Sequence, residues 1–369
     1  MQKMFIFLLI MATALGFYGC AQQERAGQEQ VGTAESNKPP EPVQREITDL
    51  GGNVVKVPPA EKLNRVVILS PPISSIQYSV LKDTSRIVAV HPLTFRNANP
   101  GIIQKVFTNL DQVDSGFIKG FNVNTEAVLN LNPDIVFYYG PQLKKGLENL
   151  KVPIVDFMNP KDRDPITVTS AWEGLIRDIF DVKNGKTIAE EWERLEADLA
   201  VSLKKAEGER LTGLMIFSNN SGKIMVSGDH TYGDYWLEMS GLINGADEID
   251  GEKEVGMEQI YQWNPDIIYV FMGEEASNYL QGIEGQDWSR VKAVQEKRVY
   301  DVPKGIFAWA APSADSPLMV RWMLTKNDPS SFSGDEFNNI VKAYYKEHYH
   351  ITLTDAMLAS ILEPNRERE

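Results

Sequence analysis

Two stretches of the chain repeat each other, TEAVLNLNPDIVFY at residues 125–138 and MEQIYQWNPDIIYV at residues 257–270. In both, a segment whose second residue is glutamate leads to Asn-Pro-Asp and then to an apolar run. Asn-Pro favours the end of a helix, because a residue before proline disfavours the helical conformation. A short apolar run is typical of a buried strand. Each copy therefore predicts a helix followed by a buried strand, and the repeat predicts two similar halves.

Other apolar runs extend this pattern on both sides of the repeat. In the first half they lie at residues 65–69, 86–90 and 153–157, and in the second at 211–217, 223–226 and 298–302. A hairpin with a glycine turn is predicted at residues 46–57. Strands that alternate with helices indicate parallel sheets with helical crossovers. Between the halves, residues 185–206 are predicted to form one long helix. Its apolar stripe consists of Ile188, Trp192, Leu195, Leu199 and Leu203.

The composition is that of a folded, acidic protein. Its 37 Lys and Arg against 51 Asp and Glu give a net charge of −14, which argues against a nucleic-acid-binding protein. Cys20 is the single cysteine. Intramolecular disulfides and zinc sites built from cysteines are therefore excluded. A chain of 369 residues predicts about two domains.

The first 44 residues are predicted to serve export and attachment. Residues 1–19 are typical of a signal peptide, with Lys3 before an apolar run that is shorter than a membrane span of about 20 residues. Cys20 follows Gly19 as in the bacterial lipobox, whose cysteine is lipidated, although Phe17 and Tyr18 depart from its usual pattern and cleavage elsewhere stays open. Residues 20–44 are predicted to form a flexible tether. We therefore expect an extracytoplasmic protein that a lipid anchors to a membrane.

The doubled motif, the early strand behind a hairpin and the midway helix resemble the solute-binding proteins of ABC importers for iron-siderophores, haem and cobalamin. The resemblance covers about residues 45–330. It implies an α/β fold of two Rossmann-like lobes with mainly parallel sheets, residues 45–182 and 208–369. One long rigid helix at 183–207 is expected to join the lobes, with the ligand cleft between them. We expect a monomer.

The resemblance also assigns a role to the glutamate of each repeat. Glu126 and Glu258 are expected to dock, one from each lobe, on arginines of a transmembrane permease. A second explanation rests on chemistry alone, since a negative charge near a helix N-terminus interacts favourably with the helix dipole. The sequence leaves both explanations open.

Ligands of open α/β sheets lie beyond the carboxyl ends of the strands, so the loops after the predicted strands supply candidate ligand-binding residues. Imidazoles could ligate a metal, aromatic rings could stack on a planar chelate, and basic groups could neutralise an anion. Each such residue is equally explained as a solvated loop residue or as part of the core. The candidates are His91, Arg96, Tyr138, Tyr139, His230, Tyr232, Lys304 and Trp309.

The expected ligand is a metal chelate, with a ferric siderophore as the first choice and cobalamin, haem or an oxyanion such as molybdate as alternatives. A free first-row metal ion is usually coordinated by three or four convergent His, Cys or carboxylate side chains. The chain has four histidines, and two of them, His348 and His350, lie two positions apart in a tail helix and so on different faces. We expect no resident metal or cofactor.

Sequence signatures of enzymes are missing, since the chain contains no GxSxG, HExxH or GxGxxG. We therefore predict a binding protein and not an enzyme. An exported hydrolase that uses Asp or Glu on a two-lobe scaffold is the alternative class, and a purely structural lipoprotein is a third.

Overall fold

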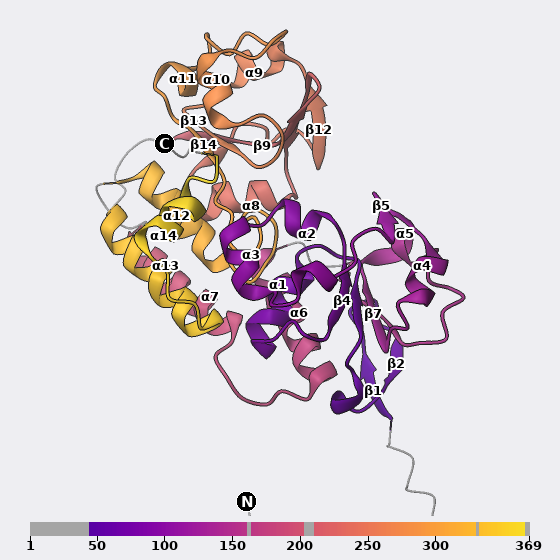
Figure 1. Ribbon diagram of the computed structural model, residues 1–369. Coiled ribbons are helices and arrows are strands. Elements are labelled where there is room, and N and C mark those ends of the chain that lie inside the picture. The colour runs from indigo at the N-terminus through magenta and orange to yellow at the C-terminus, as the bar shows by residue number, and fades with distance from the viewer. Residues whose placement is uncertain (1–43, 161–163, 203–209, 330–331, 366–369) are drawn as a thin grey trace, which may run out of the picture. The chain divides into compact units, whose positions relative to one another are not determined.

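The computed structural model describes residues 44–160, 164–202, 210–329 and 332–365 (Figure 1). The predicted signal peptide, Cys20 and all of the predicted tether except Gln44 lie outside the described residues. No helix within the described ranges is long and apolar enough to cross a membrane.

The N-terminal half contains a four-stranded parallel sheet with the order β4-β3-β7-β8. The predicted glycine-turn hairpin is confirmed, since β1 (Arg45–Thr48) and β2 (Val54–Val57) pair antiparallel. The sheet strands are β3 (Val66–Ile68), β4 (Ile87–Val90), β7 (Ile135–Tyr138) and β8 (Ile154–Asp156). A small hairpin consists of β5 (Ile118–Lys119) and β6 (Asn122–Val123), and two 3-10 turns lie at Ala60–Lys62 and Leu110–Gln112. The helices are α1 (Ile73–Leu81), α2 (Leu93–Arg96), α3 (Pro100–Val106), α4 (Thr125–Asn130), α5 (Gly140–Lys144) and α6 (Pro165–Phe180).

The C-terminal half contains a six-stranded mixed sheet with the order β12-β10-β9-β13-β14, in which β11 also pairs with β9. Strands β9, β13 and β14 are parallel, whereas β10 and β12 extend the sheet antiparallel. Ser221 and Gly222 form the turn into β10, with φ of 52° and 79°. The strands are β9 (Thr212–Asn220), β10 (Lys223–Ser227), β11 (Ile243–Asn244), β12 (Glu252–Val255), β13 (Ile267–Val270) and β14 (Val299–Asp301). The helices are α8 (Tyr232–Met239), α9 (Met257–Trp263), α10 (Ala276–Gln281) and α11 (Lys292–Gln295).

Helix α7 (Ile188–Ser202) corresponds to the long helix predicted between the halves, although it begins three residues later. The delay has a local cause, because Gly185 has a φ of 108°, which a right-handed helix does not contain. Four members of the predicted stripe, Ile188 to Leu199, are buried, and Leu203 lies outside the described residues. The helix packs against α6 of the N-terminal half and against α12 (Ser316–Asn327).

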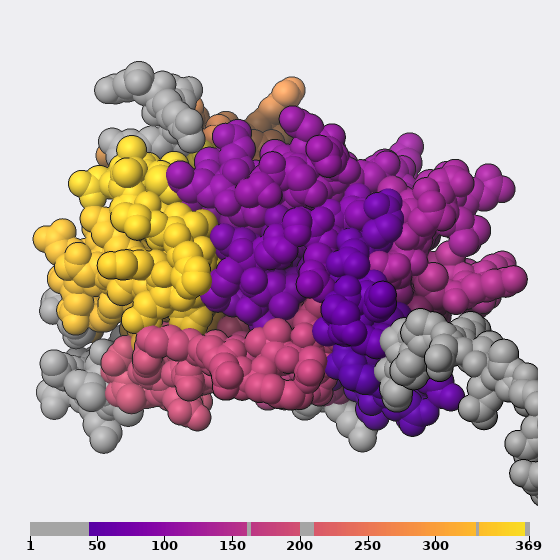
Figure 2. All heavy atoms as spheres, turned by 60° about the horizontal axis from the view of Figure 1, so that its bottom comes forward, coloured from indigo at the N-terminus to yellow at the C-terminus, as the bar shows by residue number. Residues whose placement is uncertain are grey.

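Two further helices, α13 (Gly334–Tyr349) and α14 (Asp355–Leu362), complete the chain. Figure 2 shows these C-terminal residues, in yellow, against the N-terminal half, in indigo. The contact is specific, because the Tyr78 hydroxyl on α1 donates to the Tyr349 carbonyl on α13 (3.1 Å). The hydrophobic core is accordingly continuous, and one cluster includes Phe137 of the N-terminal sheet, Trp192 of α7 and Tyr269 of the C-terminal sheet.

Candidate functional site

A cavity of about 340 Å³ lies at the carboxyl ends of strands from both sheets. The N-terminal half lines it with Pro71 and Pro72, which follow β3, and with Leu93 and Asn97 of the α2 turn. This is where ligands bind in open α/β sheets. A second cavity, of about 510 Å³, is larger, but its lining residues all belong to the N-terminal half, beside the β1–β2 hairpin. We therefore take the first cavity as the candidate ligand site.

Aromatic side chains from the C-terminal half form the opposite wall of this cavity. Phe217 near the end of β9 and Phe271 directly after β13 meet edge to face at 5.7 Å. Their proximity follows from strand pairing, because the Phe271 N–H donates to the Ile216 carbonyl of β9 (2.9 Å). Phe307 and Tyr232 add two more rings to the lining. The wall is thus suited to a ligand with an apolar or aromatic surface.

The loop that carries Phe307 is held by a buried carboxylate, Asp315. Its Oδ2 accepts hydrogen bonds from the Ile306 N–H (2.8 Å) and the Tyr345 hydroxyl (3.2 Å), and its Oδ1 accepts one from the Tyr349 hydroxyl (2.8 Å). Burial without a cationic partner raises the pKa of Asp315 to about 6. An added Cβ at Gly305 would lie 1.8 Å from the Tyr345 oxygen, so glycine is needed for the loop to approach this closely.

A pair of tryptophans connects the same wall to helix α7. The Trp236 indole N–H donates to the carbonyl of Ala310, which lines the cavity (2.8 Å). The Trp236 ring stacks on Trp192 of α7 with centroids 6.2 Å apart, and Trp192 donates to the Thr169 hydroxyl of α6 (2.9 Å). The cavity wall is therefore fixed to the helix that joins the two halves.

The fold can now be compared with known proteins. A profile described as "Periplasmic binding protein" matches residues 119–305, just over half of the chain. The chain belongs to the periplasmic binding protein family. A periplasmic solute binding protein of Veillonella parvula is 29% identical, with a TM-score of 0.73 over 87% of this chain and 97% of that chain.

Two other relatives have ligands in their names or structures. The molybdate-binding protein MolA of Haemophilus influenzae is 25% identical over 261 residues, 62% of this chain and 70% of MolA. Its molybdate-bound structure has a TM-score of 0.66, over 84% of this chain and 99% of that chain, at 21% identity. CeuE of Helicobacter pylori, in a Ni-His complex, has a TM-score of 0.66 over 87% of this chain and 99% of that chain; at 18% identity it shows the fold alone.

Family membership settles the general role of the chain. It is the solute-binding component of an ABC importer, acts outside the cytoplasm, and has a transmembrane permease and a small-molecule ligand as partners. The family and these relatives are binding proteins. The resemblance expected from the doubled motif and the two-lobe α/β fold are thereby confirmed.

Of the eight candidate ligand-binding residues of this periplasmic binding protein, Tyr232 lines the cavity. His91 is buried after β4, where its Nε2 lies 3.1 Å from the Gly120 carbonyl and its Nδ1 accepts from the Leu93 N–H (3.1 Å). Burial lowers the pKa of His91, with a smaller contribution from Arg96 in the same direction. Arg96 itself is exposed at the end of α2. His230 is exposed, with Nδ1 3.2 Å from Asp250 and 3.3 Å from Asp229.

The other four candidates do not line this cavity. Tyr138 is the last residue of β7 and is buried in the N-terminal half, where burial and the nearby Asp156 raise its pKa. Tyr139 is half-buried and packs edge to face on Trp172. Trp309 is fully buried against Phe337. Lys304 is half-buried, and its backbone N–H donates to the Ile361 carbonyl (3.0 Å).

Phe217, Phe271 and Glu252 are among the lining residues that the sequence did not single out. Phe217 was placed at the end of a predicted strand, but β9 continues to Asn220 and passes the end of its pairing with β13, so Phe217 reaches the cavity. Phe271 directly follows β13, the strand of the second repeat. Glu252 belongs to EKEV, which reads as a solvated charged segment but forms the edge strand β12. The rule about strand ends would have found Phe271; the sequence carried no comparable signal for Glu252.

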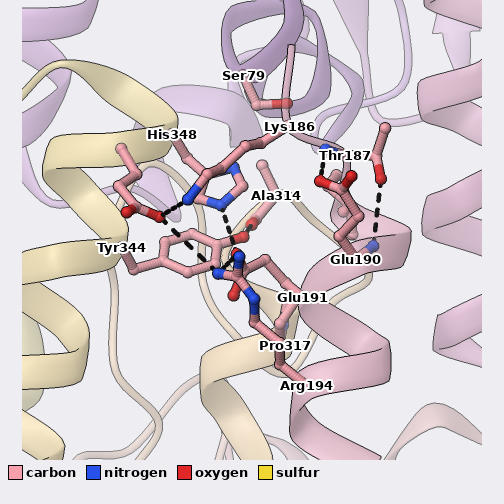
Figure 3. Close-up of polar contacts among 12 residues, drawn as sticks. Ser79, Lys186, Thr187, Glu190, Glu191, Arg194, Ala314, Pro317, Tyr344 and His348 are labelled. Atoms are coloured by element: carbon pink, nitrogen blue, oxygen red, sulfur yellow. Dashed lines mark hydrogen bonds and ion pairs between the residues drawn. The ribbon is translucent and has the colours of Figure 1, made fainter.

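One group of potential metal ligands exists among the described residues. Ligand atoms of Glu191, Glu347 and His348 lie within 4.8 Å of one another. Basic side chains already occupy this group (Figure 3): Arg194 donates to Glu191 (2.7 Å), and Lys186 pairs with Glu347. His348 Nε2 lies 3.1 Å from Glu191, and the cluster thereby ties α13 to α7. We therefore interpret this arrangement as an ion network that joins two helices, because Glu191 Oε1, Glu347 Oε2 and His348 Nε2 are already paired within the chain.

Proposed function

We propose that this binding protein captures a preformed metal chelate, such as a ferric siderophore, in the cavity between the two halves and delivers it to the permease. The observation that carries the proposal is the lining, in which Phe217, Phe271, Phe307 and Tyr232 face prolines of the other half. No histidine is among the described residues that line the cavity, so the metal would bring its own donor atoms. Haem and cobalamin are the alternative chelates.

Molybdate is the second candidate, because MolA is a relative at 25% identity. Two features support it: the cavity includes Tyr232 and Gly233 at the start of α8, and a helix N-terminus favours anions. Two features oppose it: the walls are mostly apolar, and Glu252 would lie beside the anion. We therefore place the chelate first.

Isothermal titration calorimetry with one protein preparation tests the choice. The titrants are a ferric trihydroxamate, its metal-free form, haem, cobalamin and molybdate. We expect saturable binding of a metal chelate, and in Phe217→Ala and Phe271→Ala a loss of affinity of about tenfold each, because each ring supplies buried apolar contact. Phe121→Ala is the matched control, since Phe121 is exposed and does not line the cavity. Saturation by molybdate alone would overturn the chelate and establish the second candidate.

Attachment and docking complete the proposal. Glu126 and Glu258 are exposed in the first turns of α4 and α9, a position open to a partner, and we assign them to the permease contact.

Cys20 is assigned to lipid attachment on the strength of Gly19-Cys20 after the apolar run. Intact-mass analysis of protein extracted from membranes checks the second assignment, and a mature chain with an unmodified Cys20 would contradict it.

A further inference from the structure

Glu252 is the one charged side chain among the described residues that line the cavity. It is the first residue of the edge strand β12, where it lies opposite Ser227 of β10, another lining residue. Its carboxylate makes no hydrogen bond or ion pair with any part of the chain that the structure describes. Its neighbour Glu254, two positions along the same strand, is instead paired with Lys223 (3.1 Å). The cavity therefore contains one acid without a partner.

The surroundings of Glu252 do not supply a compensating positive charge to the cavity. Lys253 directly follows Glu252 on β12 but does not line the cavity. His230 lies on the neighbouring loop, and its Nδ1 is already close to both Asp229 and Asp250. Asp229 and Asp250 are joined by a backbone bridge and do not line the cavity themselves, so Glu252 alone sets the charge of this side of the lining. Arg96 on the opposite half is exposed and is not part of the lining.

Glu252 is exposed at the rim of the cavity, and a ligand that fills the cavity would cover part of its surface. An unpaired carboxylate in apolar surroundings interacts strongly with charge, because the local dielectric constant falls when water leaves. A positive group on the ligand gains a partner in Glu252 and a favourable contact with the aromatic faces. A negative group at the same place is repelled by the carboxylate. The lining thus discriminates between ligands by the sign of their charge.

We propose that Glu252 is a specificity-determining residue and that the cavity selects a metal chelate carrying a positively charged group. This inference rests on the proposed chelate-binding function and adds the charge of the chelate to it. This charge preference excludes strongly anionic catecholate chelates as the expected ligand, because their recognition requires arginine or lysine in the lining.

Two ferric trihydroxamates with the same metal-binding core provide the test. One carries a free terminal ammonium group, and in the other that amine is acetylated, so the pair differs in charge and hardly in shape. We expect the wild-type protein to bind the ammonium form more tightly by roughly threefold to tenfold in calorimetric titrations. The ratio should shrink as the salt concentration rises, because an ion pair at a cavity rim is screened.

Two variants on the same strand assign the preference to a residue. Glu252→Gln keeps the side-chain shape and removes the charge, and we expect the two affinities to become equal. Glu254→Gln is the matched control and should retain the wild-type ratio. Equal affinities in the wild-type protein, or a preference that persists in Glu252→Gln, would overturn the inference and leave the proposed function standing. If neither trihydroxamate binds to the wild-type protein, the inference fails as well, and the proposed function fails with it only if haem and cobalamin do not bind either.

Discussion

The two copies of the repeat are nearly identical in their backbone contacts and differ in what surrounds them. Asn132 and Asn264 both have positive φ, 45° and 40°, directly before the proline of the motif. Asn264 is the C-cap of α9, whereas α4 ends at Asn130, one motif position earlier, with Leu131 as its C-cap. The Asp134 N–H donates to the Arg65 carbonyl and the Asp266 N–H donates to the Thr212 carbonyl, both at 2.8 Å. The aspartate of the motif therefore holds the start of the neighbouring parallel strand in each half.

The equivalence extends to places where the two sequences no longer resemble each other. Asp156 ends β8 and accepts from the Gly140 N–H at the start of α5 (2.8 Å), and Asp301 ends β14 and accepts from the Ala276 N–H at the start of α10 (2.9 Å). The loops at the cavity, by contrast, are unlike. The N-terminal half supplies prolines and a short turn, whereas the C-terminal half supplies the aromatic rings and Glu252. A few contacts between carboxylates and backbone N–H groups thus maintain the same arrangement of strands and helices in both halves, which we call the common frame. The residues expected to contact the ligand lie in the loops where the two halves differ.

The largest effect is expected at Asp315, which holds the Phe307 loop of the C-terminal half. Asp315→Ala leaves the Ile306 N–H and two tyrosine hydroxyls buried without an acceptor. Each lost acceptor costs about 1–3 kcal/mol, although relaxation and water reduce the sum, so we expect the free energy of unfolding to fall by about 3–5 kcal/mol. Denaturant unfolding measures this. A loss below about 1 kcal/mol would show that the loop needs no such anchor.

Asp315→Asn is the control, because it keeps an acceptor and removes the charge. The pKa of Asp315 is raised from 3.8 to about 6 in the folded protein, so the folded state binds the proton more tightly than the unfolded state. The contribution of Asp315 to wild-type stability therefore falls as the pH rises from about 4 to about 6 and is constant above that range. The stability difference between Asp315→Asn and the wild-type protein should shift in favour of the variant across this window and stay level above it.

A smaller effect is expected from the aspartate of each repeat, and it tests whether the two copies are energetically alike. Asp134 accepts from the exposed Asn64 and Arg65 N–H groups, which water can solvate in its absence. Asp266 accepts from the less exposed Thr212 N–H and also pairs with Lys292. We expect losses of about 1 kcal/mol for Asp134→Ala and about 2 kcal/mol for Asp266→Ala. Equal losses would mean that the surroundings of the two copies do not matter.

The pH dependence of Asp266 has the opposite sign to that of Asp315. Burial opposes ionisation of Asp266, but the hydrogen bonds from Lys292 and from the Thr212 N–H outweigh it and lower its pKa below the ordinary 3.8. Its contribution is therefore present above pH 3.8 and is lost as the pH falls through the lowered pKa. In Lys292→Met the folded-state pKa should move back towards 3.8, so this acid-side loss should become smaller and be complete at a higher pH. An unchanged acid limb in that variant would remove Lys292 as a cause.

The frame was predictable from the sequence because it depends on local patterns. The apolar runs at residues 65–69 and 135–138 contain the buried strands β3 and β7. Helices α4 and α9 both end before their Asn-Pro steps, α9 directly before its asparagine and α4 one residue earlier. Loop positions at the cavity also followed from the strand ends, since the loops expected after the run at residues 65–69 and after the second repeat contain Pro71 and Met272 of the lining. These inferences need no knowledge of side-chain direction.

The identity of the lining side chains was less predictable, for a physical reason. Whether an aromatic residue at a strand end faces a core or a cavity depends on where neighbouring strands stop. Tyr138 ends β7 within the sheet and is buried, whereas Phe217 lies on β9 beyond its pairing with β13 and lines the cavity. Glu252 reaches the cavity because β12 pairs antiparallel with β10. This strand pairing is a long-range contact, and the charged sequence of β12 gives no pattern from which it could be predicted.

The smallest effect is expected at the glutamates of the two repeats, and it is the one that bears on transport. Glu126 and Glu258 are exposed, lie in equivalent first turns and line no part of the cavity. Exposed ion pairs contribute about 0.2–1 kcal/mol, so we expect Glu126→Ala and Glu258→Ala each to lower uptake about twofold to fivefold, and the double variant by roughly the product. Ligand affinity should stay within about twofold of the wild-type value, because neither carboxylate touches the ligand site. Uptake is measured with a labelled ferric chelate in proteoliposomes that contain the permease, and ligand affinity is measured by calorimetry of the isolated variants. Glu148→Ala, at an exposed position outside the repeat, is the control. A parallel loss of ligand affinity would mean that the glutamates act on the ligand, and a loss of uptake in only one single variant would show that the permease contacts just one of the two halves.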